Sequence, residues 1–305
     1  MKNTLIAFIL IVATAITGCT LKKDKEFQPI DESGYTLIHA DFKDLNFSDE
    51  ENVWKGEAIG VFGSEMGYNE SYAIKNAYVG TSKAAFYGPM VKGDIAAYYP
   101  YDPSFIGDAH AMPFTLASDQ SYLKESDNEG TEEFEDAVSL FRKYNPTAFA
   151  HMRNGKMDFY YPTGLLSLTL AFPEPMTVKT LRISSQSEGL SGLGVVMGDS
   201  SSKMTEGANK YITIDCGEGL VSKDENGQLT EFYVVMVPGT YDDLQVSVFF
   251  ENNDSPFVCN LPEVVIEKIN SSDSQMQLTT VSIDMPDNDG NGPDGFEEVE
   301  EEFEE

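Results

Sequence analysis

The chain has 305 residues, and its 51 acidic and 20 basic residues give a formal net charge of −31. Binding to a phosphate backbone or to an anionic membrane surface needs clustered Lys and Arg, so this charge excludes simple versions of both. With 41% hydrophobic residues the chain can bury packed cores, and its length favours two domains over one.

The N-terminus has the pattern of an export signal. A short basic start precedes an apolar run over residues 5–16, which is too short for a bilayer core of about 30 Å but suits a signal peptide. Residues 16–19 (ITGC) resemble the lipobox of bacterial lipoproteins, in which the cysteine is acylated and becomes the new N-terminus. We therefore expect residues 1–18 to be a lipoprotein signal peptide and Cys19 to carry the lipid, palmitate included. The alternative is an ordinary secretion signal that leaves Cys19 in a released protein.

The segment after the cysteine predicts a tether. Residues 19–33 carry several charges and no apolar periodicity, which is typical of a flexible linker. Charged residues directly after a lipidated cysteine also resemble the surface-export signals of Bacteroidetes lipoproteins. The expected location is the outer membrane, lipid-anchored and facing the cell surface, with periplasmic retention as the alternative.

Strand patterns dominate the remainder. Short runs rich in β-branched and aromatic residues, bounded by Gly, Pro, Asn or Asp, predict strands and an all-β fold of antiparallel β-sandwiches. The predicted strands cover residues 36–40, 58–62, 95–99, 165–172, 178–184, 211–216, 232–237, 244–250, 264–269 and 278–283. One helical pattern is present, at residues 132–144, which could also be an ordered loop. Residues 189–194 (GLSGLG) are interpreted as a turn, since no helix follows them as a nucleotide site would require.

The domain division is predicted from polar turns. The segment 153–156 suggests an N-terminal domain over residues 34–154 and a C-terminal domain over 155–285, although the prolines at 173–175 compete as a boundary. Residues 286–305 hold ten acids and no base, so a disordered acidic tail is expected there.

Three segments, in order and spacing, resemble the fimbrillin-like (Mfa-like) surface lipoproteins of Bacteroidetes. They are residues 54–62 (WKGEAIGVF), 93–101 (GDIAAYYPY) and 232–241 (FYVVMVPGTY), with 161–170 (YPTGLLSLTL) lying between the second and the third. The resemblance covers roughly residues 36–283. It implies two tandem transthyretin-like antiparallel β-sandwich domains and a role as subunit, anchor or tip of a surface fimbria.

The same resemblance implies a mode of assembly. Shaft subunits of such fimbriae are trimmed after an Arg near the N-terminus, and a partner's strand fills the groove that this exposes. Here the only arginines are Arg142, Arg153 and Arg182, all inside the expected folded region. The chain is therefore expected to be an anchor, accessory or tip-type adhesion component, with other fimbrial subunits or host and bacterial surface ligands as partners. The alternative is a stand-alone glycan- or protein-binding lipoprotein of the outer membrane.

A donor strand is expected near the C-terminus, if the chain donates one. Residues 278–283 alternate in character, and Leu278, Thr280 and Ser282 share one face of the predicted strand. The acidic tail itself cannot enter an apolar groove, because burying a run of like charges is costly.

The tail contains one metal-like pattern. Asp287, Asp289, Asn291 and Glu298 have the spacing of an EF-hand calcium loop, with Gly292 at its bend. No helices flank it and Pro293 falls within it, so weak association of Ca²⁺ is the favoured interpretation and no cofactor is expected otherwise.

The remaining candidate groups have ordinary interpretations. Cys216 and Cys259 each lie in an apolar strand, so two separate buried thiols are favoured over a disulfide, which an oxidising compartment would permit. The three histidines are far apart, and no nucleophile motif or phosphate loop is present, so no enzyme activity is expected. Trp54 with the tyrosines at 98, 99 and 101 could form a glycan platform but more often forms core.

Overall fold

The computed structural model describes residues 35–41, 54–123, 134–224, 226–251, 253–268 and 279–284. The predicted signal peptide, Cys19, the tether and the acidic tail with its calcium-like loop lie outside these residues. Within them the prediction of an all-β fold is confirmed, since strands dominate and the one α-helix, α1 (Ala137–Lys143), is seven residues long. No helix in these ranges combines the length and the apolar character needed to span a lipid bilayer.

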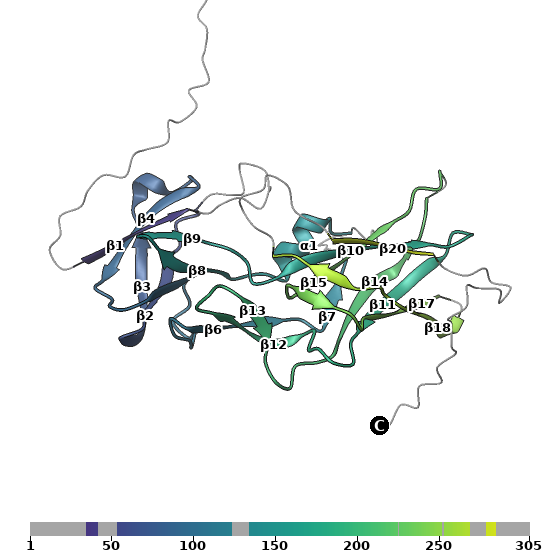
Figure 1. Cartoon of the computed structure of the whole chain (residues 1–305). Coiled ribbons are helices and arrows are strands. Elements are labelled where there is room, and N and C mark those ends of the chain that lie inside the picture. The colour runs from purple at the N-terminus through teal and green to yellow at the C-terminus, as the bar shows by residue number, and fades with distance from the viewer. Residues whose placement is uncertain are drawn as a thin grey trace, which may run out of the picture. The chain divides into compact units, whose positions relative to one another are not determined.

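A first group of strands closes into a barrel in the order β1-β4-β3-β2-β5-β8-β9 (Figure 1). Closure comes from β1, which pairs antiparallel with β4 on one side and parallel with β9 on the other. A 3-10 helix, η1 (Asn76–Tyr78), precedes β4. The strands are β1 (Tyr35–Asp41), β2 (Ile59–Gly63), β3 (Met66–Ile74), β4 (Lys83–Pro89), β5 (Ile95–Tyr99), β8 (Ala148–Arg153) and β9 (Lys156–Asp158).

The barrel interior is filled by aromatic side chains packed against small residues. Gly60 of β2 lies under the Tyr98 ring, and a Cβ built there would come within 1.9 Å of it, so only glycine fits. Trp54 is 1% exposed, makes edge contacts with Phe86 and Phe159, and donates its indole N–H to the Ser82 carbonyl at 2.9 Å.

Two larger sheets contain most of the remaining strands. One has the order β18-β17-β11-β14-β7 and the other β15-β10-β20. Their bounds are β7 (Asp119–Ser121), β10 (Gly164–Ala171), β11 (Thr177–Ser184), β14 (Tyr211–Val221), β15 (Glu231–Met236), β17 (Gln245–Phe250), β18 (Asn253–Asn260) and β20 (Thr279–Asp284).

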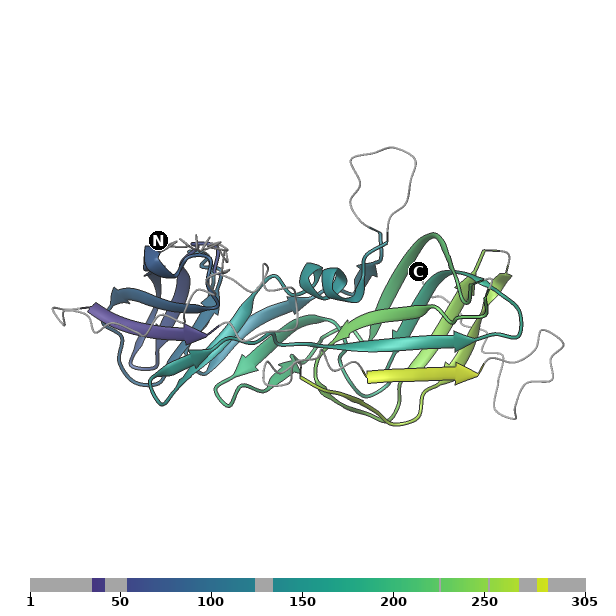
Figure 2. The ribbon, with the colours of Figure 1, turned by 90° about the horizontal axis from the view of Figure 1, so that it is seen from above.

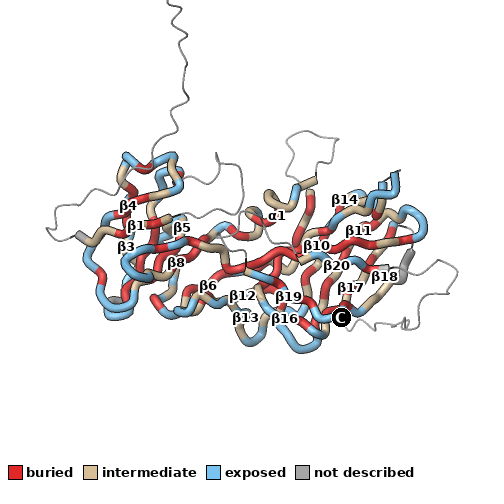
Figure 3. The backbone as a smooth tube through the Cα atoms, turned by 45° about the horizontal axis from the view of Figure 1, so that its top comes forward, coloured by how far each residue is buried: buried red, intermediate tan, exposed pale blue. Residues whose placement is uncertain are grey.

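Burial follows the period of two that a half-buried sheet requires (Figure 3). In β17 half-buried and buried residues alternate strictly, and the buried ones join those of β10, β11 and β15 in one hydrophobic core. The first seven residues of β10 are all buried, as expected for a strand covered on both faces.

Two small sheets complete the fold. One has the order β13-β12-β6 and the other pairs β16 with β19. The prediction of a turn at 189–194 is partly wrong, because residues 192–194 begin β12, where Gly194 lies under the Phe114 ring of β6. These strands are β6 (Ala111–Leu116), β12 (Gly192–Met197), β13 (Ser202–Met204), β16 (Gly239–Tyr241) and β19 (Val264–Ile266).

Strands cross the predicted domain boundary at residues 154 and 155. β6 pairs with β12 and β7 pairs with β14, so two strands from before the boundary lie in sheets built from after it. The division into two tandem transthyretin-like domains stays a prediction.

Candidate functional site

Strand β20 occupies the edge of its sheet and is the first candidate for partner contact. It runs parallel to β10 from Thr279 beside Leu166 to Asp284 beside Ala171, and Figure 2 shows it in yellow along the sheet. Two side-chain hydrogen bonds hold it: Thr279 Oγ1 donates to the Val265 carbonyl at 2.6 Å, and the hydroxyls of Thr169 and Ser282 lie 2.7 Å apart. On its other side β20 has no strand partner within the described ranges. A strand edge of this kind is a template for adding another strand.

The predicted donor-strand residues fall on this element in part. Thr280 and Ser282 lie in β20 with exposed side chains, and their role in a donor strand stays a prediction. Leu278 lies outside the described residues. The burial of β20 comes from the opposite face, where Ile283 is only 8% exposed.

The opposite edge of the same sheet is closed by side chains from β7. The Gln120 amide donates to the Val235 carbonyl at 2.8 Å and accepts from the Val235 N–H at 2.9 Å, so it forms the same pair of bonds as a neighbouring peptide group. One position along, Tyr122 donates its hydroxyl to the Tyr233 carbonyl at 3.0 Å. Gln120 is 0% exposed and Tyr122 is 2% exposed. The edge strand β15 is therefore covered, whereas no described side chain or strand closes the free edge of β20 in the same way.

Gln120 and Tyr122 were missed from the sequence. Gln120 lies in a strand of three residues and Tyr122 directly follows it, and the bonds of Gln120 reach across 115 positions of the chain. The alternation Asp-Gln-Ser-Tyr carries no hydrophobic signal that would predict a buried amide.

Strand β1 is the second candidate, because the resemblance implies that a first strand can be released. It forms seven Cα pairs with β4 and three with β9. Ile38 is 0% exposed and Ala40 is 2% exposed, so both side chains are part of the barrel core. Releasing β1 would open a slot between β4 and β9 and would expose this apolar surface.

The structure places none of the arginines near the start of β1. Arg142 lies in α1, Arg153 ends β8, and Arg182 lies in β11, where its guanidinium carbon is 4.4 Å from the Tyr211 ring centre. The described residues that precede β2 therefore contain no Arg at which trimming could free β1.

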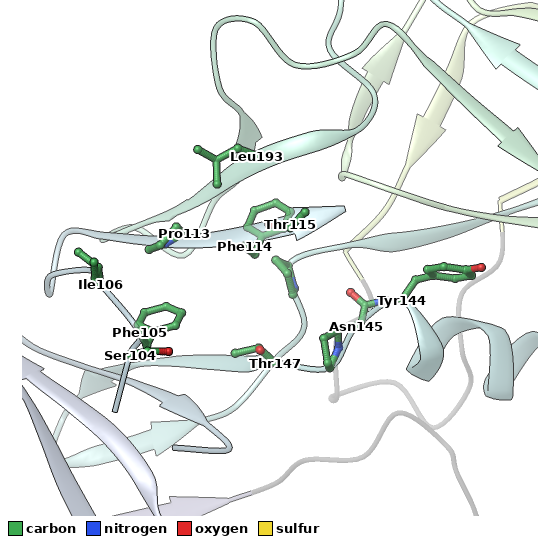
Figure 4. A pocket seen from close by; sticks show the side chains of 12 residues that line it. Ser104, Phe105, Ile106, Pro113, Phe114, Thr115, Tyr144, Asn145, Thr147 and Leu193 are labelled. Atoms are coloured by element: carbon green, nitrogen blue, oxygen red, sulfur yellow. The ribbon is translucent and has the colours of Figure 1, made fainter. Parts of the chain in front are cut away.

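An apolar groove of about 460 Å³ lies beside β6 (Figure 4). None of the residues that line it is charged. Ile106 is 86% exposed and Leu193 is 52% exposed, which is unusual for large aliphatic side chains. The lining consists of Ser104, Phe105, Ile106, Pro113, Phe114, Thr115, Tyr144, Asn145, Pro146, Thr147, Pro162 and Leu193.

Two residues that line this groove, Asn145 and Tyr144, are fixed by hydrogen bonds. Asn145 donates its side-chain N–H to the Phe141 carbonyl at 2.7 Å, and its side-chain oxygen accepts from the Thr163 hydroxyl. Tyr144 accepts the Ser121 N–H at 2.5 Å through its hydroxyl. A wall that is already ordered lowers the ordering cost that a partner's side chain meets on binding.

The proposed aromatic platform does not form. Trp54 and Tyr98 are each 1% exposed, and Tyr98 donates its hydroxyl to the Asp102 carbonyl at 2.6 Å. Tyr99 donates its hydroxyl to Glu57 at 2.7 Å, and burial, followed by this carboxylate, raises the Tyr99 pKa. These rings serve the barrel, which was the favoured interpretation from the sequence.

Both described cysteines are free, and the sheet order explains why they do not meet. Cys216 lies in β14 and Cys259 in β18, with β11 and β17 between them. Three strand spacings put them about 14 Å apart, well beyond the about 7 Å between Cα atoms that a disulfide tolerates. Burial raises the pKa of Cys216 to about 12 and that of Cys259 to about 11, so both thiols remain protonated at neutral pH.

Metal and acid–base chemistry find little support. Within the described ranges no group of three or more His, Cys, Asp or Glu side chains could hold a metal ion. The calcium-like positions Asp287, Asp289, Asn291 and Glu298 lie outside those ranges, as does Cys19.

Comparison with known proteins finds similarity in structure alone. No protein-family model matches the chain, and no curated protein matches it. A proposed cell adhesion protein of Bacteroides ovatus is 14% identical, with a TM-score of 0.43 over 77% of this chain and 89% of that one. A second, from Bacteroides uniformis, is 13% identical, with a TM-score of 0.42 over 82% and 94% of the two chains.

A third neighbour is the tip fimbrial protein Mfa3 of Porphyromonas gingivalis, which is 10% identical with a TM-score of 0.35 over 77% of this chain and 82% of that one. The structural neighbours are thus cell adhesion and fimbrial proteins of Bacteroidetes, the group that the sequence resemblance indicated. At this level of similarity no residue role is carried over from them.

Proposed function

We propose that the chain is a fimbrillin-like component of cell adhesion, lipid-anchored at the outer membrane and exposed at the cell surface. It acts through contact between its own strands or surface and a partner, and involves no catalysis. The observation that carries the proposal is the asymmetry of the sheet β15-β10-β20, in which Gln120 and Tyr122 close one edge and β20 leaves the other open. A molecule that avoided all strand addition would close both.

Within that role we favour an anchor, accessory or tip-type component over a shaft subunit. The barrel is closed by β1, and no Arg precedes β2 among the described residues. A chain that keeps its first strand has no groove to offer a partner, but it can still donate or extend β20. The two-domain, transthyretin-like division belongs to this proposal and is tested by limited proteolysis, which should release two separately folded fragments.

A disulfide between β20 and β10 tests whether the strand is donated. Ser167 and Thr280 are Cα partners, so the double variant Ser167→Cys/Thr280→Cys can be oxidised to lock β20 in place. If β20 leaves its sheet to enter a partner, oxidation abolishes SDS-resistant ladders and co-purifying filaments from cells, and reduction restores them. If β20 stays and only its free edge accepts a strand, the locked protein still assembles.

A matched control uses one substitution in the other sheet. Val246 is the Cα partner of the native Cys259, so Val246→Cys can form a bridge between β17 and β18. This bridge stiffens the fold without touching β20 and should leave assembly unchanged. Absence of any ladder or filament from cells that make the unlocked protein would contradict a fimbrial role.

The lipid anchor has its own test. Cells fed labelled palmitate should incorporate label into the native chain and not into Cys19→Ser. Label in the variant, or none in the native chain, would contradict the anchor while leaving the strand argument intact.

The second candidate function is binding of a glycan or protein by a stand-alone lipoprotein, which the apolar groove favours. Retention on a glycan array or on an apolar peptide, lost in Phe105→Ala and kept in an exposed variant elsewhere such as Tyr68→Ala, would support it. Retention unaffected by changes in the groove would count against it.

A further inference from the structure

An arginine without an ionic partner lies at the centre of the five-stranded sheet. Arg182 belongs to β11, which pairs with β17 on one side and with β14 on the other in the order β18-β17-β11-β14-β7 (Figure 1). Among the described residues no carboxylate lies within ion-pair distance of Arg182, and its Nε is buried without a hydrogen-bond partner. A buried donor that stays unpaired costs free energy, so a ligand that accepts from this guanidinium removes that cost.

The guanidinium is held by a contact that leaves its N–H groups free. Its carbon lies 4.4 Å from the centre of the Tyr211 ring, a cation–π contact that uses the flat face of the group, whereas its N–H donors point outward in its plane. Tyr211 is the Cα partner of Ser184. Asp215 pairs with Thr180 instead, and its carboxylate accepts the Gly217 N–H at 2.9 Å. The contact with Tyr211 therefore draws the guanidinium toward the Ser184 end of the strand, away from this acid.

Hydroxyl groups surround Arg182 on the same face of the sheet. Thr213 of β14 and Ser247 of β17 are its Cα partners, and Ser184 follows two positions later in β11. Side chains two positions apart share a face, and neighbouring strands lie about 4.8 Å apart, so one small ligand can reach all of these groups. The three hydroxyl residues are half-buried, and no other described side chain bonds to their hydroxyls. We call Arg182, Ser184, Thr213 and Ser247 the Arg182 face.

The other cation of β11 differs from Arg182, because its charge is neutralised. Lys179 Nζ lies 3.5 Å from a carboxylate oxygen of Glu218 and 3.5 Å from one of Glu251. Arg182 has no such pair among the described residues, although the chain carries 51 acids and a net charge of −31. An unpaired cation with a rigid fork of donors favours a carboxylate as its ligand.

The acids at the margins of the Arg182 face already have donors. Asp119 of β7 is the Cα partner of Thr213, and its carboxylate accepts the Ser118 hydroxyl at 2.9 Å. Asp243, just before β17, accepts the Ser185 hydroxyl at 2.7 Å and two N–H groups of the turn after β11 at 2.9 and 2.8 Å. Neither forms an ion pair with the guanidinium, so the carboxylate must come from the ligand.

The backbone around Arg182 is fully paired, which decides what kind of ligand fits. β11, β14 and β17 each have a strand on both sides, so none of them offers a free edge to an added peptide strand. Recognition here depends on side chains alone: a fork of N–H donors that matches a carboxylate, and hydroxyls that both donate and accept. A sugar that carries a carboxylate presents the complementary groups, a charged pair of oxygens and a ring of hydroxyls.

We propose that the Arg182 face binds a carboxylate-bearing sugar of the uronic or sialic acid class. The carboxylate accepts hydrogen bonds from the guanidinium, and the sugar hydroxyls exchange hydrogen bonds with Ser184, Thr213 and Ser247. This face lies in a different sheet from β20 and shares no residue with the groove beside β6, so it does not rest on the role proposed for either.

The small number of arginines makes the site directly observable by NMR. Labelling the full chain with ¹⁵N-arginine gives Nε–H signals from Arg142, Arg153 and Arg182 only, and Arg182→Lys identifies the last of them. We expect glucuronate to shift the Arg182 signal in a saturable way and to leave the other two signals in place. Glucose, which lacks the carboxylate, should shift none of them.

Substitutions separate the guanidinium from the overall charge, with binding followed on the backbone amide signals of β17. Arg182→Gln should weaken glucuronate binding about tenfold or more, because charge-assisted hydrogen bonds are lost. Lys179→Gln is the matched control, since it removes the same charge from the same strand and should keep the native affinity. Ser247→Ala should weaken glucuronate binding about two- to tenfold and leave the affinity for acetate unchanged.

Far-UV circular dichroism and thermal unfolding establish that the variants are folded. If Arg182→Gln does not fold, Arg182→Lys carries the test. It keeps the charge but loses the planar fork, so it must bind glucuronate more weakly than the native chain does.

Several outcomes would contradict the proposal. Equal shifts of all the arginine signals, or no shift at Arg182, would make glucuronate an adventitious ion only. Acetate that binds as tightly as glucuronate would show that the sugar is not recognised. A glutamate-containing peptide that binds more tightly than glucuronate would assign the face to an acidic protein. Native affinity in Arg182→Gln would show that the guanidinium takes no part in binding.

Discussion

Strands β1 and β20 differ in how firmly they are held, although each pairs parallel with an inner strand. β1 lies between β4 and β9 and contributes Ile38 and Ala40 to the barrel core, whereas β20 has one strand neighbour and contributes mainly Ile283. A strand with two neighbours and a buried face cannot leave without exposing apolar surface and two edges. The comparison indicates that the two strands have different tasks: β1 closes the barrel, and β20 is the strand that can contact a partner.

The largest expected effect is on the stability of the barrel. Ile38→Ala removes a side chain that is 0% exposed and should lower the free energy of unfolding by about 2–5 kcal/mol. Val281→Ala in the half-buried face of β20 should cost about 1 kcal/mol or less. Urea denaturation of both variants checks the difference. Equal losses of unfolding free energy in the two variants would contradict the proposed difference between β1 and β20.

Gln120→Ala should have the next largest effect, because it opens the edge that is now closed. The buried N–H and C=O of Val235 lose their partners, which costs about 1–3 kcal/mol for a buried group. The exposed edge of β15 should also cause self-association that depends on concentration, measured by sedimentation velocity. Gln120→Glu, which can accept but not donate when ionised, serves as the control for the lost donor. A Gln120→Ala variant that stays monomeric would show that the edge of β15 does not need the cover that Gln120 provides.

Acid should loosen the barrel before it affects β20. Burial, followed by Lys156 and Lys75, lowers the pKa of His39 in β1, and burial, followed by Lys268 and Arg153, lowers that of His151 in β8 to about 4. In the fold each ring takes up a proton less readily than in the unfolded chain, where a histidine titrates near pH 6.5. Their contribution is therefore complete above pH 6.5 and is lost as the pH falls from there toward 4.

Hydrogen exchange at pH 7 and pH 5, corrected for the intrinsic rates, measures this difference strand by strand. Protection should fall in β1 and β8 and change little in β20. His151→Asn should flatten the profile in β8. Equal loss of protection in β1 and β20 would contradict the assignment.

The smallest effect is expected at the hydroxyl pair that fastens β20. Ser282→Ala removes the 2.7 Å contact with Thr169 and should cost about 0.5–1.5 kcal/mol. The loss should appear as faster exchange of β20 amides with the barrel unchanged. An effect that spreads to β1 would show that the two strands unfold together.

Much of the strand content could be predicted, because long apolar runs report burial directly. Residues 95–99 were predicted as a strand and form β5 with the same bounds, and 178–184 and 244–250 differ from β11 and β17 by one residue. The helical pattern at 132–144 yields α1 at Ala137–Lys143, which starts where Asp136 accepts the Ser139 N–H at 2.8 Å. In these segments the local sequence pattern and the tertiary structure favour the same secondary structure.

Short and polar strands could not be predicted, because their stability comes from neighbours far along the chain. β3 contains Asn69, Glu70 and Ser71 and carries no clear alternation, yet it pairs with β2 and β4. The closure of the barrel by β9, three residues long, has no local signal either. A strand at 278–283 was predicted and forms β20, although its role as a donor stays a prediction, whereas the cover of β15 by Gln120 depends on contacts across 115 residues of sequence.

The parallel pairing of β10 with β20 also has a consequence in time. Residues 279–284 lie more than a hundred positions after 166–171, so in a chain that is exported from its N-terminus they are the later of the two segments to reach the place of folding. Until then β10 has only β15 beside it, and its other flank stands open to any extended segment in the vicinity. The folding chain therefore passes through a stage in which a strand from another molecule and its own β20 compete for the same edge of β10.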